Sequence, residues 1–308
     1  MGWILLAILA AVAIDRFIPD RFGLKPFAWY RDWVESIEQR FNGGKRGQGI
    51  GAVLLATVPI VVGAMIVRFV LGEIAIVLRF AFDVVVLYFC LDIYRLGKTG
   101  GDIAESLQLG DLEAANENLI ELNGKGAPEQ HEASIARSAI EAILRQGNAL
   151  IISPIFWFIL LGPAGALLQR LASILDMMWG HRYDRFVEFG WLAARLDDVL
   201  GWVPARITAI SYAIMGSFED ALRCWRQRMS VWSDINSGPL LASGLGAMHM
   251  QTCELEVEPT EFDGDSDVVL ADAGHVRRAV ALVWRVMLFW LAIGVLMTIA
   301  HFWGAIGG

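Results

Sequence analysis

The sequence predicts an all-α, polytopic helical membrane protein with about five spans, one of them broken, and a helical region outside the membrane. The 308 residues are 56% hydrophobic, include 12 Trp and have a mean hydropathy of +0.51, which is more apolar than a soluble domain needs to fill its core. Only 19% of the residues are charged, and they cluster between apolar runs instead of being spread over a water-facing surface. The longest runs reach the length of a membrane-spanning helix.

The first apolar run covers residues 3–14. It has no basic region before it and no small-residue cleavage site after it, so we expect a retained helix and not a signal peptide. The run is short for a span, and we expect flanking residues to complete it.

Residues 50–72 and 74–91 predict a tight hairpin of two membrane helices. Arg68 lies near the end of the first run, where a long side chain can reach the membrane surface while its stem stays in lipid. Arg79 and Asp83 are four residues apart, so they share a helix face and can pair inside a bundle.

Residues 92–148 are polar and acidic, with helical patterns at 102–122 and 134–144 that predict an extramembrane segment. The apolar stretch 149–168 follows. Pro154 and the Gly162-Pro163 step break its helix, which a membrane tolerates only where neighbours satisfy the freed backbone groups. We therefore expect a broken or re-entrant span.

Residues 170–228 alternate apolar and charged positions. Within them, Arg206 is the only charged residue of the stretch 199–216, so this stretch fits either an interfacial helix or another membrane pass. Residues 254–272 predict an acidic exposed loop, and 280–302 predict a last span. The expected organisation is one membrane domain, 1–308, with polar insertions at about 92–148 and 170–278.

The distribution of basic residues predicts the topology. Arg and Lys gather between the first two apolar runs, and Arg277 and Arg278 precede the last one. By the positive-inside rule both flanks are cytoplasmic. We therefore expect a multi-pass protein of a bacterial-type inner (plasma) membrane, with both termini outside and the polar middle facing the cytoplasm.

Two classes of function are excluded by composition. A net charge of -8 and a pI near 5.2 argue against nucleic-acid binding, which needs a basic face. Cys90, Cys224 and Cys253 are far apart and form no ligand spacing, so neither a disulfide framework nor a zinc site is indicated.

The most unusual segment, residues 175–209, packs carboxylates and guanidinium groups between aromatic residues. Arg provides fixed bidentate donors for phosphate or carboxylate, and Asp is a hard oxygen ligand for a magnesium ion that carries a nucleotide. The plainer interpretation is an ordinary ion pair of Arg195 with Asp197 or Asp198, together with an Arg206 that reaches from an interfacial helix to the membrane surface.

Three stretches in this segment and at its start resemble the signature block of the CobD/CbiB family, the membrane-bound adenosylcobinamide-phosphate synthases of cobalamin biosynthesis. These stretches are Ser173–Arg182, Phe189–Val199 and Pro204–Ala209. Weaker resemblance extends over Arg137–Ala142, Ser153–Trp157 and Asn236–Pro239. The resemblance implies ATP-dependent amide formation between adenosylcobyric acid and an aminopropanol compound.

The resemblance also implies a set of ligand-binding residues, with magnesium and ATP as cofactors if the synthase chemistry holds. The carboxylates would be metal or hydrogen-bond partners, with any magnesium at Asp197 and Asp198, and the guanidinium groups would clamp anions. A nucleotide or a corrinoid intermediate would be the partner besides the lipid bilayer. The candidates are Asp176, Arg182, Arg195, Asp197, Asp198, Arg206 and Asn236.

Several family motifs are replaced in this chain. Residues 122–126 stand in place of an Arg-Asp-Thr, residues 145–150 in place of a Glu-Asn-x-x-Asp-Gly, and residues 246–250 in place of a Leu-Gly-Gly. These departures favour the AmpE-like sister group, which is linked to signalling in beta-lactamase induction and cell-wall recycling. We therefore expect an AmpE-like signalling or accessory protein that retains a nucleotide or small-anion pocket and is not an enzyme, with the synthase and a non-catalytic membrane scaffold as alternatives.

Overall fold

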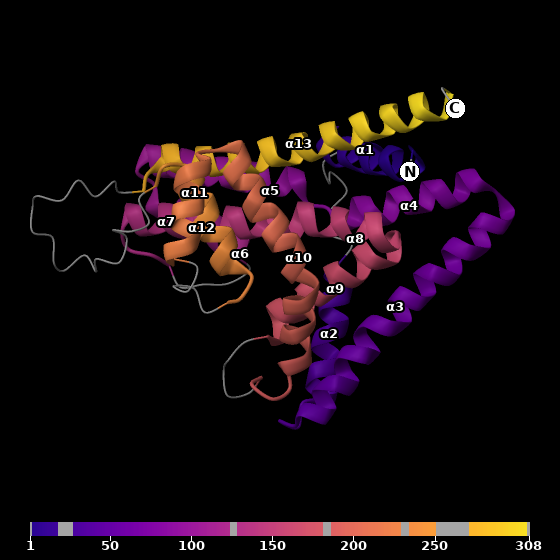
Figure 1. The fold of residues 1–308 in the computed structure, drawn as a ribbon. Helices are drawn as coiled ribbons and strands as arrows, with labels where there is room; N and C mark the ends of the chain where they lie inside the picture. Colours follow the sequence, from indigo (N-terminus) through magenta and orange to yellow (C-terminus); the bar gives the residue numbers. More distant parts are fainter. Residues whose placement is uncertain are drawn as a thin grey trace, which may run out of the picture. The chain divides into compact units, whose positions relative to one another are not determined.

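The computed structural model describes residues 2–17, 27–123, 128–180, 186–228, 234–250 and 271–306. Within these ranges the chain forms helices and turns and no strand, which confirms the all-α prediction (Figure 1). The helices are α1 (Gly2–Phe17), α2 (Ala28–Phe41), α3 (Arg46–Ile74), α4 (Ile76–Cys90), α5 (Ile93–Leu109), α6 (Leu112–Asn123), α7 (Glu132–Gly147), the π-helical turn η1 (Asn148–Ile152), α8 (Ser153–Leu161), α9 (Pro163–Trp179), α10 (Trp191–Met215), α11 (Phe218–Arg228), α12 (Ser237–Ala247) and α13 (Ala273–Ile306).

Three helical runs in the described residues are long and apolar enough to cross a membrane. They are Arg46–Ile74, Glu132–Leu161 and Ala273–Ala300. The helices α1 and α4 have only 16 and 15 residues, which is below the usual length of a span. The polytopic class is therefore supported, and the number of five spans stays a prediction.

The chain divides into two compact units. Unit 1 comprises residues 1–94, 149–201 and 291–308, and unit 2 comprises residues 95–148 and 202–290. Each unit is thus assembled from segments that are distant in the sequence. The helices α10 and α13 are each divided between the two units, after Gly201 and after Trp290. The single membrane domain with polar insertions stays a prediction.

In unit 1, α3 and α4 form the expected hairpin, joined at Ala75 (Figure 1). Asp83 pairs with Arg68 of the facing helix, through Nε–Oδ1 at 2.7 Å and Nη2–Oδ2 at 3.1 Å. The expected pairing of Asp83 with Arg79 is therefore wrong, and Arg68 does not simply extend to the surface. Two parallel N–H···O contacts between one guanidinium group and one carboxylate make a strong and geometrically specific pair.

The polar segment before residue 148 and the apolar segment after it form one helical run. The turn η1 joins α7 to α8, and Pro154 lies in the first turn of α8 without ending the run. A π-helical turn widens the helix locally, so it relieves the clash that a proline ring makes with the preceding turn. The predicted break at Pro154 is therefore wrong.

The run ends where the sequence predicted its second break. Gly162 adopts a φ of 69°, a left-handed conformation that suits glycine, and Pro163 begins α9. The chain reverses, and the backbone at Gly165 comes against the carbonyl oxygen of Trp157, 2.5 Å from the position that a Cβ would take. α8 and α9 therefore pack closely because a glycine lies at their contact.

The core of unit 2 is α12, in which all residues from Ser237 to Ala247 are buried. A helix that is apolar or small on all sides belongs inside a protein. Its glycines permit close contacts: a Cβ on Gly244 would lie 2.7 Å from the Leu144 side chain, and one on Gly246 would lie 2.6 Å from the Asp220 carbonyl oxygen. The sequence had assigned this segment to a polar insertion, because glycine, alanine and serine contribute little hydropathy.

Buried polar contacts tie α10 to the rest of unit 2. Tyr212 donates a hydrogen bond to the Leu144 carbonyl oxygen at 2.9 Å, next to the π-helical turn, and Ser243 donates to the Ala209 carbonyl oxygen at 2.6 Å. Both side chains are buried, and each has a backbone acceptor, as buried hydroxyl groups require.

We expect Arg68→Leu to destabilise the protein by about 3 kcal/mol, because it leaves the Asp83 carboxylate without its ionic partner in an apolar hairpin. The double variant R68L/D83L should recover most of this loss. Chemical unfolding in detergent measures both. The matched control is Arg79→Leu, which removes an exposed guanidinium group of the same hairpin; an equal loss in R79L would contradict the assigned pair.

Candidate functional site

The signature block begins at the end of α9, where Asp176 lies in the last turn. The Asp176 carboxylate lies directly against Gly180, since a Cβ on Gly180 would be 1.9 Å from Asp176 Oδ1. Glycine at position 180 thus leaves room for the acidic side chain. Arg182, a further candidate, lies outside the described residues.

Phe189 and Gly190, just before α10, pack between α9 and α3. A Cβ on Gly190 would lie 1.7 Å from the Trp179 carbonyl oxygen of α9, and one on Gly49 of α3 would lie 1.9 Å from the Phe189 carbonyl oxygen. The Phe189 and Trp179 rings meet edge to face at 5.1 Å, and both are buried. These residues of the block fix where the charged part of α10 begins.

A half-exposed ion pair lies next to the contact between α3 and Phe189. Arg46, at the start of α3, binds Glu188 with Nε–Oε2 at 3.0 Å, and its guanidinium group lies 4.8 Å from the centre of the Trp191 ring. Half-exposed ion pairs contribute little to stability on their own, so the glycine contacts carry most of the packing here.

Arg195, Asp197 and Asp198 lie in the first turns of α10. Arg195 Nη1 is 3.7 Å from Asp198 Oδ2, and the Arg195 side chain is 62% exposed. Arg195 thus pairs with Asp198, one of the two partners that the sequence offered. Among the residues that the structure describes, no group of three or more His, Cys, Asp or Glu side chains could hold a metal ion, and magnesium at Asp197 and Asp198 stays a prediction.

In unit 2 the structure brings together two of the predicted residues, Arg206 and Asn236. Arg206 Nη1 donates to Asn236 Oδ1 at 3.3 Å and to the Trp202 carbonyl oxygen at 2.9 Å, and Nη2 donates to the Ile235 carbonyl oxygen at 3.3 Å. The guanidinium group also lies 4.2 Å from the centre of the Trp202 ring. A group held by three acceptors and a ring is fixed in place, as an anion clamp requires.

The segment that carries Asn236 is itself ordered by Asp234. This carboxylate accepts hydrogen bonds from the Asn236 and Ser237 backbone N–H groups, both at 3.1 Å, and from the Ser237 hydroxyl. It therefore satisfies donors at the start of α12, where a negative charge is favourable. The sequence did not single out Asp234, although Asp-x-Asn-Ser before a small-residue helix is a capping pattern.

One of the replaced family segments also contacts the block. Thr208, in the stretch that begins with Pro204, donates to Asn148 Oδ1 at 2.9 Å, and both side chains are buried. Asn148 belongs to residues 145–150, which stand in place of the family's acidic motif. A polar side chain therefore still lies against the block at this point.

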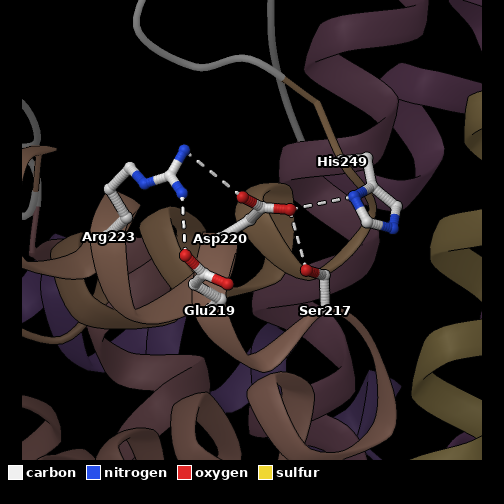
Figure 2. A network of polar contacts seen from close by, with 5 residues as sticks. All are labelled: Ser217, Glu219, Asp220, Arg223 and His249. Atoms are coloured by element: carbon white, nitrogen blue, oxygen red, sulfur yellow. Dashed lines mark hydrogen bonds and ion pairs between the residues drawn. The ribbon is translucent and has the colours of Figure 1, made fainter.

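Beyond the candidates, a network of polar contacts joins α11 to the end of α12 (Figure 2). The Asp220 carboxylate accepts from the Ser217 hydroxyl at 2.7 Å, lies 2.9 Å from His249 Nδ1, and is 3.5 Å from Arg223. Arg223 also binds Glu219 at 3.3 Å. His249 lies in an apolar stretch of the sequence, yet its side chain is 74% exposed, and its φ is 58°.

The two groups of candidates belong to different units. Asp176, Arg195, Asp197 and Asp198 lie in unit 1, and Arg206 and Asn236 lie in unit 2. The geometry of each group is defined within its own unit, and the assignment of all seven residues to one ligand site stays a prediction.

The apolar helices, the reversal at Gly162 and the charged block together define a polytopic helical membrane protein. A sequence model of the CobD/Cbib protein family matches residues 8–283, and the chain belongs to this family. No solved structure matches it.

Two curated relatives match nearly the full chain, and a third matches a shorter part of it. The cobalamin biosynthesis protein CobD of Stutzerimonas stutzeri is 32% identical over 301 residues, which cover 94% of this chain and 96% of the relative. That of Chromobacterium violaceum is 31% identical over 306 residues, with 92% and 93% covered. That of Mycobacterium tuberculosis is 34% identical over 199 residues, with 61% and 62% covered.

The expectation of an AmpE-like signalling protein in beta-lactamase regulation is therefore wrong. It depended on missing motifs, whereas the matches extend over the chain under the CobD name. The contact between Asn148 and Thr208 gives a physical reason: a replaced segment can keep a polar contact with the block while its motif is lost.

We expect Gly49→Ala to destabilise the protein by about 2 kcal/mol, because the new methyl group collides with the Phe189 backbone in a packed contact. Gly51→Ala is the matched control on the same helix, since a Cβ there meets nothing within 4 Å; it should be neutral or slightly stabilising. Unfolding in detergent measures the difference. Equal effects of the two substitutions would refute the close contact between Gly49 and Phe189.

The Ser217 hydrogen bond, together with His249 and Arg223, lowers the pKa of Asp220 from its ordinary value of 3.8. Its contribution to stability is thus present above that value and lost as the pH falls through the lower folded pKa. We expect Asp220→Asn to reduce the unfolding midpoint at pH 6 and to have a smaller effect at pH 3. Glu219→Gln, which changes an 88% exposed carboxylate, is the control. A deficit in D220N that does not change with pH would rule out the charge as its cause.

Proposed function

We propose that this chain is a membrane enzyme of cobalamin biosynthesis that forms the amide bond between adenosylcobyric acid and an aminopropanol compound with ATP. The observation that carries the proposal is the match to two relatives named cobalamin biosynthesis protein CobD, which covers 94% and 92% of the chain. The expectation of a protein without catalytic activity is given up with the AmpE-like assignment.

The Arg206 group fits one need of this reaction, the recognition of an anion. Both the nucleotide and the acid carry negative charge, and a guanidinium group recognises phosphate or carboxylate through paired N–H donors. The contacts to Asn236 and to two backbone carbonyl oxygens hold Arg206 in one orientation before any ligand arrives. A clamp held in this way loses less conformational entropy on binding.

Asp197 and Asp198 fit a magnesium ion that arrives with its nucleotide better than a resident metal. Magnesium commonly takes one or two carboxylates and completes its shell with waters and phosphates, and the described residues offer no larger cluster of ligands. ATP would supply the activation of the acid. The part of Asp197 and Asp198, with Asp176, would be to position the metal-bound phosphates, and Arg195 would keep Asp198 oriented.

We place the protein in the inner membrane of a bacterium, with the polar middle on the cytoplasmic side. The basic residues that flank the apolar runs support this orientation. It would give the nucleotide access to the charged block from the cytoplasm, and a nucleotide and a corrinoid intermediate would be the ligands.

We expect this gene to restore corrinoid synthesis in a bacterial strain that lacks its cobinamide synthase. In the same assay Arg206→Gln should lower the rate roughly 30-fold, the equivalent of about 2 kcal/mol for a charge-assisted contact. Arg223→Gln removes a guanidinium group outside the proposed site and should complement like the parent. If the parent chain fails while it is present in the membrane, a non-catalytic scaffold is favoured instead.

A further inference from the structure

The unit 2 part of α10, residues 202–215, presents an apolar stripe to the outside. Trp202, Ile210 and Ile214 are 47%, 49% and 47% exposed. Arg206 lies among them at the same helical spacing, i to i+4. The opposite face, with Ala205, Ala209 and Tyr212, is buried. Contiguous exposed apolar side chains beside a basic group mark a surface that is covered in the working protein.

The exposed residues in the first part of α13 change from charged to apolar along the helix. Its exposed residues Arg277, Arg278 and Arg285 are charged, whereas Leu288 and Trp290 that follow are apolar and 57% and 39% exposed. A change from guanidinium groups to leucine and tryptophan within one turn is typical of the level at which a helix enters the membrane.

Two hydrogen bonds set α10 and α13 in register at this level. Trp290 Nε1 donates to Ser211 Oγ at 2.9 Å, and Arg285 Nη1 donates to the Met215 carbonyl oxygen at 2.9 Å. The two helices thus run in opposite directions here. Ile210 and Ile214 are the neighbours of the bonded residues, so they lie at the height where α13 turns apolar.

We propose that Ile210, Ile214, Leu288 and Trp290 form a lipid-facing patch that rests at the boundary between headgroups and acyl chains, with the membrane surface crossing unit 2 between Arg285 and Leu288. The occupant of the patch is the lipid bilayer. Further along the sequence of the same candidate span, the apolar side chains of Leu296, Met297 and Ile299 are also exposed. Tryptophan and arginine at its edges suit the interfacial region.

Arg206 lies one helical turn from Ile210 on the same stripe of α10, so the patch borders the Arg206 group.

The test uses the full chain with a genetically encoded benzophenone residue, placed one at a time at positions 210, 214 and 288. The protein is reconstituted in vesicles of phosphatidylethanolamine and phosphatidylglycerol and irradiated, and adducts are identified by mass spectrometry. The substituted side chains are exposed, so the core is preserved. Position 296 is the lipid-facing reference and position 219 the water-facing one.

We expect lipid adducts at 210, 214 and 288 with yields comparable to that at 296 and several-fold above that at 219. Crosslinks from 210 and 214 to another polypeptide would overturn the proposal in favour of a protein partner or a second copy of the chain. Yields at 210 and 214 as low as at 219, with 296 labelled normally, would show that water covers this face and would also overturn it.

Discussion

In an apolar environment a polar group must form its hydrogen bonds with other polar groups of the protein, because neither lipid tails nor apolar side chains can form them. Much of this structure follows from that constraint. The Arg68 fork holds Asp83 across the α3–α4 hairpin, and Tyr212 donates to a carbonyl oxygen beside the π-helical turn. The chain reverses at Gly162, where the left-handed backbone lets α9 begin directly. These points of the apolar helices are thus matched by a specific partner or by a residue that suits the backbone.

Close packing then determines where the charged residues lie. Gly49 and Gly190 allow three backbones to meet around Phe189, and Gly180 leaves room for Asp176. In unit 2 the small residues of α12 let α7 and α11 approach it, while Asp234 orders its first turn and the loop that carries Asn236. Part of the family signature therefore positions the helices. The charged side chains available to bind a ligand are those that lie beside these packed contacts.

The sequence predicted features that depend on local patterns. Hydrophobic length indicated α3 and α13, and the Gly162-Pro163 step indicated the reversal, because both are properties of neighbouring residues. The sequence did not predict that Asp83 forms its ion pair with Arg68 instead of Arg79, because Arg68 lies on another helix. The change of polarity at residue 148 does not end a helix, because backbone hydrogen bonds continue through η1. The proximity of Arg206 and Asn236 came from a family resemblance and not from spacing, and the His249 contact depends on how α11 and α12 pack.

The burial of α12 has a consequence for how the protein is made. This helix has 11 residues and is apolar or small throughout, and at 1.5 Å per residue it is about 16 Å long. An insertion machinery that selects segments by hydrophobic length would pass over a helix of this size, because about 20 residues are needed to span a bilayer. The segment would then reach its buried position only when α7 and α11 pack around it. Correct biogenesis of unit 2 then depends on a segment that is apolar enough to form a core and too short to be taken up by the membrane.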